Sequence, residues 1–250
     1  MSVTKPIVRP LPNYSLRPFG YTAALKGEFA MLMNTAVSKS VESDREHIVI
    51  KPSVLYVGTP VVLITSLNPD GTTNISPMSS AWALLDRIVL GLTSTSKGRE
   101  NAMRERQLVL NFPSPDLWPK IEALAPTTGR NPVPLHKEKI GYRFESDKFD
   151  IADFTPQAAD LVRPLRIAEC PIQIEAEVVA SHEPGGEWPS ERPEAFRIIE
   201  VKAVRVHAHR DIVVPGTHHI DTNRWSPLLY VFRHYFGIGP DLGRTFKAET

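Results

Sequence analysis

Three hydroxyls, an ammonium, a glycine and a guanidinium stand together in the hexapeptide Ser94–Arg99, STSKGR. The hexapeptide follows a strand-like segment and opens a helix-like one that extends to about Arg106. The first N–H groups of a helix lack partners and carry partial positive charge, so they bind phosphate. Ser96 is a candidate N-cap, and Lys97 and Arg99 add charge beside it. The pattern predicts a phosphate site; the alternative is an ordinarily capped surface helix with solvated cations.

The segments before the hexapeptide must position it. Pro60–Leu67 is an apolar run with strand composition, and Asn68–Gly71 (NPDG) has turn chemistry at every position. Thr72–Ser80 brings the chain back with small and polar side chains, and Arg87–Thr93 is an alternating apolar strand. The small residues of the second strand fill a core poorly, but they let a flat ligand approach the backbone closely.

Four sequence blocks carry a family resemblance. They are PVVLITSLNPDG, NISPMSS, TSTSKGRENA and LVLNFPSPDLW, in this order. In their order and spacing the chain resembles the flavin reductase-like, FMN-binding split-barrel family, well over Pro60–Asp116 and plausibly out to His209. The resemblance implies a mainly β fold, a Greek-key-like split β-barrel with peripheral helices. It also implies a homodimer with the flavin near the subunit interface.

The resemblance further implies an oxidoreductase. Hydride would pass from NAD(P)H to FMN, and electrons would go on to oxygen, free flavin or a partner oxygenase. Hydride transfer to a flavin needs orientation more than acid–base help, so no catalytic side chain is predicted. The extra segments of this chain leave nicotinamide use open. The alternative is a non-catalytic FMN-binding carrier or sensor.

Candidate flavin contacts fall into groups by role. The hexapeptide would hold the phosphate, and the small polar strand would contact ribityl hydroxyls and the pyrimidine edge. Met78 and Trp82 could lie against the ring system, with ordinary core packing as the alternative. Asn101 and Asn111 are additional candidates. The predicted set is Asn74, Ser76, Met78, Ser79, Ser80, Trp82, Thr93, Ser94, Ser96, Lys97, Arg99, Asn101 and Asn111.

The predicted organisation has one barrel domain with additions at both ends. Residues 1–45 are a proline-rich arm and a helix packing on the barrel. Residues 46–215 form the barrel, and its insertion, residues 114–166, is where a substrate pocket would vary. Residues 216–250 are a tail that docks on the core or on a second subunit, and its aromatic run Pro227–Phe236 has a helix-like composition.

Other elements can be read from periodicity and turn residues. A first short strand is expected at His47–Tyr56 and a helix from Ser114 to Leu124. Pro171–His182 alternates clearly, and Phe196–His209 is a second long strand. The apolar register of that strand changes sides, which predicts a β-bulge near Lys202 or Ala203.

Composition excludes several classes of protein. The net charge is +1 and no basic stripe occurs, which argues against nucleic-acid binding. Cys170, the only cysteine, excludes an internal disulfide and a CxxC site, and a small buried thiol is expected there. No apolar run is long enough to span a membrane, and the N-terminus lacks the core of a signal peptide. A cytoplasmic protein is therefore expected.

Histidines gather near the end of the sequence without a zinc spacing. They are His207, His209, His218, His219 and His234. No carboxylate triad accompanies them, so no metal site is predicted. His207 and His209 share a strand face with Arg205, and this polar face could edge the flavin pocket.

Overall fold

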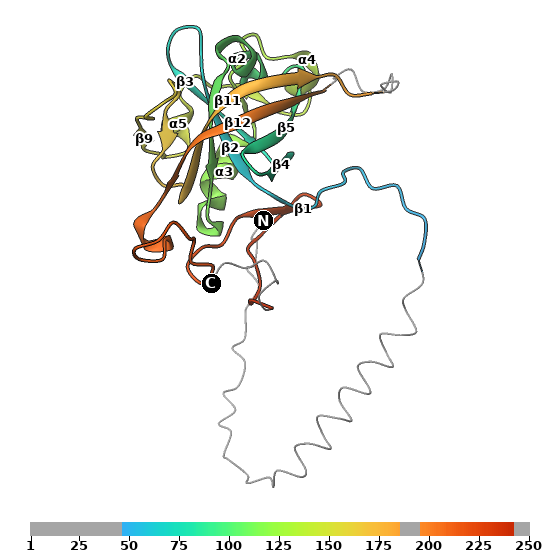
Figure 1. Ribbon diagram of the computed structural model, residues 1–250. Coiled ribbons are helices and arrows are strands. Elements are labelled where there is room, and N and C mark those ends of the chain that lie inside the picture. Colours follow the sequence, from blue (N-terminus) through green and yellow to red (C-terminus); the bar gives the residue numbers. More distant parts are fainter. Residues whose placement is uncertain (1–46, 186–195, 243–250) are drawn as a thin grey trace, which may run out of the picture. The chain divides into compact units, whose positions relative to one another are not determined.

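The computed structural model describes residues 47–185 and 196–242, so the predicted arm and helix of residues 1–45 lie outside the described residues. The residues from Ser53 onwards belong to one compact unit, Ser53–Thr250. Within this unit, seven antiparallel strands form one curled sheet in the order β3-β2-β6-β11-β12-β5-β4 (Figure 1). A mainly β fold with short helices around it confirms the predicted fold class.

The strands of this sheet are β2 (Val62–Leu67), β3 (Thr73–Met78), β4 (Ala81–Leu84), β5 (Arg87–Thr93), β6 (Gln107–Phe112), β11 (Ile172–His182) and β12 (Phe196–Ala208). Three small sheets pair β1 (Val57–Pro60) with β13 (Leu229–Val231) and β14 (His234–Phe236), β7 (Thr127–Thr128) with β8 (Arg143–Phe144), and β9 (Pro156–Gln157) with β10 (Arg166–Ile167). The helices are α2 (Lys97–Glu105), α3 (Trp118–Leu124), α4 (Leu135–Glu138) and α5 (Lys148–Ile151), with 3-10 turns at Pro115–Leu117 and Arg210–Ile212.

The turn between β2 and β3 forms as its residues dictate. The Gly71 N–H donates to the Asn68 carbonyl at 3.0 Å, and Gly71 has φ of +85°, which favours glycine. The Asp70 carboxylate accepts from the Thr72 N–H at 3.0 Å. This local chemistry fixes the register of β2 and β3, in which Thr65 lies opposite Ile75.

The predicted bulge occurs between the two longest strands, β11 and β12. Glu175 lies opposite Arg205, but Ala176 lies opposite Ala203, so Val204 is the extra residue. The bulge is thus within two residues of its predicted position. A second shift, at Val179, increases the twist of the same pair.

Two buried clusters lie on opposite faces of the sheet. The inner cluster fills the curl of the sheet and includes Val62, Ile64, Leu90, Leu108, Leu110, Ile199 and Val201. The outer cluster joins β2, β3, α3, the insertion and the tail, and includes Leu63, Ile75, Ile121, Leu124, Phe154, Ile167, Cys170 and Leu228. Alternation along β2 supplies both, because neighbouring strand residues point to opposite faces. Cys170 is fully buried, as predicted, and burial raises the pKa of its thiol strongly.

The sheet is open between β3 and β4, its two edge strands. These strands are consecutive in the chain, and Ser79 and Ser80 join them. The joint lies close against β5: the Gly91 N–H donates to the Ser80 carbonyl at 2.8 Å. A Cβ added at Gly91 would lie 3.2 Å from the Ser80 Cβ, so glycine allows the approach.

Two expectations about secondary structure are wrong. Residues 47–56 form no strand; Pro52 has no N–H to donate, and pairing starts only at β1. The aromatic run of the tail is a β-hairpin, because β13 pairs with both β1 and β14. Phe232 and Arg233 turn this hairpin with φ of 41° and 72°, the positive values of a two-residue type I′ turn.

Candidate functional site

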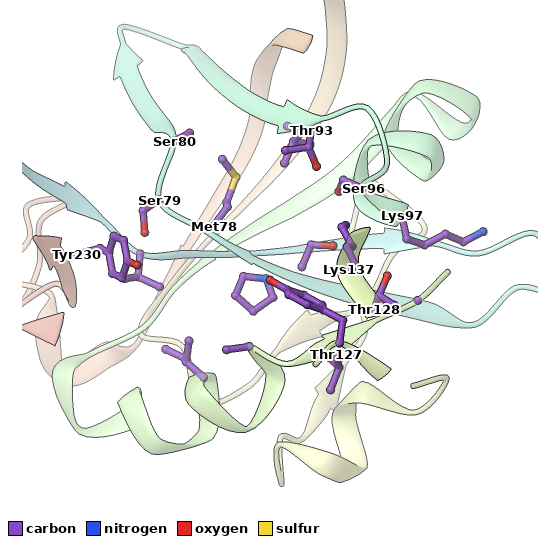
Figure 2. Close-up of a pocket in the computed structure, with 18 of the residues that line it drawn as sticks. Met78, Ser79, Ser80, Thr93, Ser96, Lys97, Thr127, Thr128, Lys137 and Tyr230 are labelled. Atoms are coloured by element: carbon purple, nitrogen blue, oxygen red, sulfur yellow. The ribbon is translucent and has the colours of Figure 1, made fainter. Parts of the chain in front are cut away.

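A cavity of about 490 Å³ opens along the edge of β3 and its joint with β4. Figure 2 shows Met78, Ser79 and Ser80 on one side of this pocket. The other walls come from the end of β5, from the start of α2, from the insertion and from the tail hairpin. The small strand that the sequence assigned to a flat ligand therefore borders the cavity.

The helix-start side of the pocket consists of Thr93, Ser96 and Lys97. The Ser96 side chain caps α2, because its Oγ accepts from the Arg99 N–H at 3.3 Å, which confirms the predicted N-cap. The N–H groups of the first turn have no partner within the helix. At Gly98 an added Cβ would lie 2.6 Å from the Ser76 Oγ, so only glycine lets the helix start reach β3 this closely.

The Glu100 carboxylate pairs with two cations, Lys97 and Arg130, next to the start of α2. The Lys97 Nζ lies 2.9 Å from a Glu100 oxygen, and Arg130 contacts the other Glu100 oxygen at 2.9 Å. Figure 2 accordingly shows the Lys97 side chain extending away from the other labelled side chains. The pKa of Glu100 is lowered, chiefly by the hydrogen bond from Lys97.

Arg99 lies next to this group in a crowded cationic environment. Burial lowers the pKa of Arg99, and the neighbouring guanidinium groups of Arg197 and Arg130 lower it further. The Nε atoms of Arg99 and Arg130 are buried and have no hydrogen-bond partner among the described residues. Like charges with unused donors favour an anion nearby.

The insertion wall of the pocket faces the helix-start side. It consists of Thr127, Thr128 and Gly129 around β7, Lys137 on α4 and Lys148 on α5. A Cβ added at Gly129 would lie 2.5 Å from the Asn74 Oδ1 and 3.0 Å from the Lys97 Cγ. The insertion wall therefore packs directly against Asn74 and Lys97, next to the predicted phosphate site at the start of α2. Figure 2 places Thr127 and Thr128 opposite Thr93 and Ser96. The Lys137 Nζ reaches across to the helix-start side, where it lies 3.5 Å from the Thr95 carbonyl.

Three tyrosines close the end of the pocket near β1. The Tyr56 hydroxyl and the Ser80 Oγ are 2.7 Å apart, and the rings of Tyr56 and Tyr230 meet edge to face at 5.4 Å. The Tyr235 hydroxyl donates to a Glu122 oxygen at 3.1 Å. Burial is the main cause that raises the pKa of Tyr235, and the neighbouring Glu122 carboxylate raises it further. The tail thus takes part in the pocket through its own hairpin.

Seven of the thirteen predicted contacts line this pocket: Ser76, Met78, Ser79, Ser80, Thr93, Ser96 and Lys97. The other six lie outside its lining: Asn74, Trp82, Ser94, Arg99, Asn101 and Asn111. Asn74 stands directly behind it, with its Nδ2 donating to the Ser76 Oγ at 3.0 Å and its Oδ1 buried without a partner. Trp82 is 59% exposed on β4.

Asn101 and Asn111 are fully buried and hold the fold together. Asn101 donates to Asn68 at 2.8 Å, which ties α2 to the hairpin turn. Asn111 donates to the Leu63 carbonyl at 2.9 Å and accepts from the Ile167 N–H at 2.9 Å. Their polar atoms form hydrogen bonds within the protein, so these side chains are not available to a ligand in the pocket.

Sequence reasoning missed the insertion and tail contributions to the lining. From the insertion they include Thr127, Thr128, Gly129, His136, Lys137, Tyr142 and Lys148, and from the tail Tyr230 and Tyr235. Tyr56, which precedes β1, was missed as well. The tripeptide Thr127–Gly129, two hydroxyls followed by glycine, was a usable local signal. Lys148 gave none, because its role depends on burial that only the folded insertion creates.

The polar face of β12 serves another purpose than the pocket. The His207 Nε2 lies 2.7 Å from the buried Glu175 carboxylate, and the His209 Nε2 lies 2.8 Å from the Ala168 carbonyl. Neither histidine belongs to the lining, so the expectation that they edge the pocket is wrong. The insertion covers this face of the sheet and takes up their hydrogen bonds.

Asp160, Glu175 and His207 bring three potential metal ligands within 4.8 Å of one another. Glu175 already accepts from the N–H groups of Asp160 and Leu161, at 2.8 and 2.6 Å, and Arg205 pairs with Asp160 at 2.6 Å. The carboxylates are thus satisfied by protein donors. The group acts as a clamp on the insertion.

Comparison with known proteins identifies the class. A model of the flavin reductase like domain matches residues 54–239. The chain belongs to this family. An uncharacterized protein of Bacillus subtilis (strain 168), YdfE, is 44% identical over 201 residues, which cover 80% of this chain and 94% of that protein.

Solved structures share the fold at low identity. Flavoredoxin of Desulfovibrio vulgaris (Miyazaki F) has a TM-score of 0.64 at 17% identity, covering 81% of this chain and 98% of that one. Nitrilotriacetate monooxygenase component B from Bacillus cereus has a TM-score of 0.60 at 16% identity, covering 94% and 100%. Across the described ranges, no helix is long and apolar enough to cross a membrane.

Proposed function

We propose that the chain binds FMN in this pocket and acts as an oxidoreductase. Hydride would come from NAD(P)H, and electrons would pass on to oxygen, free flavin or a partner protein such as an oxygenase. The observation that carries the proposal is the capped start of α2, which opens into a pocket lined by hydroxyls and lysines. Family membership supports a flavin and an oxidoreductase role.

The residues present fit a phosphate-bearing flavin. The first N–H groups of α2 and the Thr93 and Ser96 hydroxyls offer donors to a phosphate. The unused Nε of Arg99 and the shared pair Lys97–Glu100 supply charge that an entering phosphate can draw on. Gly98 keeps β3 and the helix start close enough to act on one ligand.

The edge of β3 and its joint with β4 would orient the ring system. Ser76, Ser79 and Ser80 present hydroxyls and backbone to its polar rim, and Met78 offers an apolar contact. Bound flavin supplies the electron chemistry; the protein supplies orientation and controls access. Tyr56 and Tyr230 would limit water at one end of the pocket.

The visible spectrum of the purified full chain tests this function. Bound FMN should show flavin absorption, and NADH or NADPH should bleach it rapidly without oxygen. A protein that holds flavin but is bleached by neither nucleotide would be the carrier or sensor instead. Failure to bind flavin at all would remove the proposal.

FMN should bind more tightly than FAD. The donors that suit a phosphate gather at one place, the start of α2, which matches a single terminal phosphate. Equilibrium titration with both flavins decides the point, and clearly tighter FAD binding would contradict it.

We also propose that the protein is a homodimer, because apolar side chains are exposed on the edge strand β4.

A further inference from the structure

One buried cation in the pocket lining, Lys148, is held without a counter-charge. The residue is 3% exposed, and its Nζ donates to the Ile75 carbonyl at 2.8 Å. An ammonium carries three N–H donors, and this bond uses one of them. Among the described residues, no carboxylate lies in ion-pair contact with Lys148, whereas Lys97 pairs with Glu100 at 2.9 Å. Burying a charge with so little compensation is costly, so a ligand that completes its hydrogen bonds would stabilise it.

The fold holds the Lys148 amine at the pocket wall. Asp147 caps α5 by accepting from the Asp150 N–H at 3.1 Å. Phe149 and Ile151, from the same helix, pack against the outer cluster, so α5 cannot turn the lysine into water without losing core contacts. The amine therefore stays where a molecule in the pocket can reach it.

The carbonyl that Lys148 contacts lies on the free edge of β3. Among the described strands, β3 pairs only with β2, so backbone groups on its other edge have no strand partner. Pro77 lies two residues after Ile75 and faces the same edge, where its missing N–H leaves no backbone donor for a ligand. Pro77 and Lys148 both line the pocket. The ammonium thus supplies a charged donor beside a position of the edge that has none.

The phosphate of the proposed flavin has other donors. Thr93, Ser96 and the first N–H groups of α2 lie on the helix-start side of the pocket. The Lys137 Nζ also belongs to that side, because it lies 3.5 Å from the Thr95 carbonyl. Lys148 instead contacts β3, whose edge would orient the ring system. The polar rim of a flavin ring carries carbonyl oxygens and ring nitrogens, which accept hydrogen bonds from such a donor.

Lys148 brings a positive charge to this place at neutral pH. Burial lowers the pKa of Lys148 from 10.5 to about 8, the nearby Lys137 also lowers it, and Glu145 opposes the shift. At pH 7 the amine is therefore still mainly protonated. A ligand that becomes negative beside it would form a charge-assisted hydrogen bond, which is stronger than the bond to a neutral ligand.

Reduction changes the charge of a flavin ring in a way that suits this lysine. The oxidised ring is neutral. A hydride delivers two electrons and one proton, so the ring gains one negative charge unless a second proton follows. A cation at the rim, shielded from water, then binds the reduced ring more tightly than the oxidised ring and raises its reduction potential.

We propose that the Lys148 ammonium donates to the polar rim of the bound flavin ring and stabilises the negative charge that reduction places there. This inference rests on the proposed function and adds the residue that sets the reduction potential of the flavin. The proton stays on Lys148 throughout, so the lysine acts through its charge and its hydrogen bonds.

The midpoint potential of the bound flavin tests this inference. The full chain is loaded with FMN and reduced stepwise at pH 7 with a chemical reductant and a reference dye, while the visible spectrum is recorded. Lys148→Met should lower the preference for reduced over oxidised FMN at least tenfold, so the two-electron midpoint potential should fall by about 30 mV or more. Methionine is unbranched and uncharged, so the packing around α5 should be retained.

Two further variants separate the charge from other effects. Lys148→Gln keeps an N–H donor but removes the charge, and it should lower the midpoint potential by a similar amount. Lys139→Met is the matched control, since Lys139 is exposed, belongs to the same insertion and lies outside the lining. Its midpoint potential should equal that of the parent.

Other outcomes would overturn the inference. If Lys148→Met leaves the midpoint potential unchanged or raises it, or if Lys148→Gln keeps the parental potential, the charge of Lys148 does not act on the reduced ring. If Lys148→Met weakens oxidised FMN but not riboflavin, which lacks the phosphate, Lys148 belongs to the flavin phosphate. A parent protein that binds no flavin would remove the proposed function itself, so the two failures are distinguishable.

Discussion

The two sides of the pocket hold positive charge in different ways. On the helix-start side, Lys97 pairs with Glu100 one turn along α2, and these side chains are 16% and 36% exposed. On the insertion wall, Lys148 is buried and bonds to the backbone carbonyl of Ile75, on a strand far away in sequence. The first arrangement is local and partly solvated; the second depends on tertiary packing.

This difference has consequences for stability. A solvated pair such as Lys97–Glu100 contributes little to folding and leaves its charge available to a ligand. The insertion wall exists only because long-range bonds hold the insertion in place. Glu175 accepts from the N–H groups of Asp160, Leu161 and Val162, and Asn111 accepts from that of Ile167.

The largest expected effect comes from breaking the insertion's anchor. Glu175→Ala should lower the free energy of unfolding by about 3 kcal/mol, because it leaves buried N–H groups of the insertion unpaired. Chemical denaturation measures the loss. Glu177→Ala, which removes an exposed glutamate two residues further along the same strand, should lower the free energy of unfolding by less than about 0.5 kcal/mol. Equal losses for both variants would show that Glu175 is no anchor.

Lowering the pH should weaken the anchor that Glu175 provides. Burial alone would raise the pKa of Glu175, but the N–H groups of Asp160 and Leu161 and the His207 ring outweigh it, so the pKa is lowered. A carboxyl whose pKa is lowered by folding stabilises the protein above its usual pKa and loses this contribution as the pH falls. Below pH 4 the parent should therefore lose stability more steeply than Glu175→Ala.

Lys148→Met should reveal the buried charge through pH. The pKa of Lys148 falls from 10.5 to about 8 on folding, so between these values the unfolded chain binds more protons. The stability of the parent should then rise by roughly 2 kcal/mol relative to Lys148→Met as the pH increases from 7.5 to 10. Lys137 and Glu145, the charged neighbours, are unchanged in both proteins. A constant difference across this range would mean that Lys148 is solvated.

The same contrast explains what could be predicted from sequence. The helix start was predictable because cap, charge and glycine lie within six residues, and the hairpin turn because Asn68–Gly71 specifies its own geometry. The β12 bulge was visible as a change of apolar register. Lys148 and Glu175 carry no such local signal, since their burial arises from the insertion folding over the sheet.

On the helix-start side, single substitutions should affect ligand binding more than folding. Lys97→Ala and Arg99→Ala should each weaken FMN roughly tenfold, the usual size of a charge-assisted bond to phosphate. Glu100→Gln should strengthen FMN binding, because it releases Lys97 from its partner. Fluorescence titration of FMN measures all three, with Lys139→Ala as the exposed control. Unchanged affinity in both cation variants would show that the phosphate binds elsewhere.

The smallest expected effect concerns a face away from the pocket, the edge strand β4. Trp82 and Leu84 on β4 and Leu85 in the turn that follows it are 59%, 64% and 94% exposed, a grouping of large apolar side chains that a second copy would cover. Leu85→Lys should weaken the proposed dimer about fivefold, or about 1 kcal/mol, and leave thermal stability of the monomer unchanged because Leu85 is almost fully exposed.

Sedimentation equilibrium over a range of concentrations measures this dissociation constant. Leu242→Lys is the matched control, since Leu242 is 97% exposed and lies outside the β4 group. If the helix-start side and the insertion wall complete the pocket within one chain, Leu85→Lys should leave FMN affinity unchanged even as the dimer weakens. If FMN affinity falls together with dimer affinity, the second subunit completes the site. A parent that sediments as a monomer throughout would refute the proposed dimer, because the exposed group on β4 would then be stable in water.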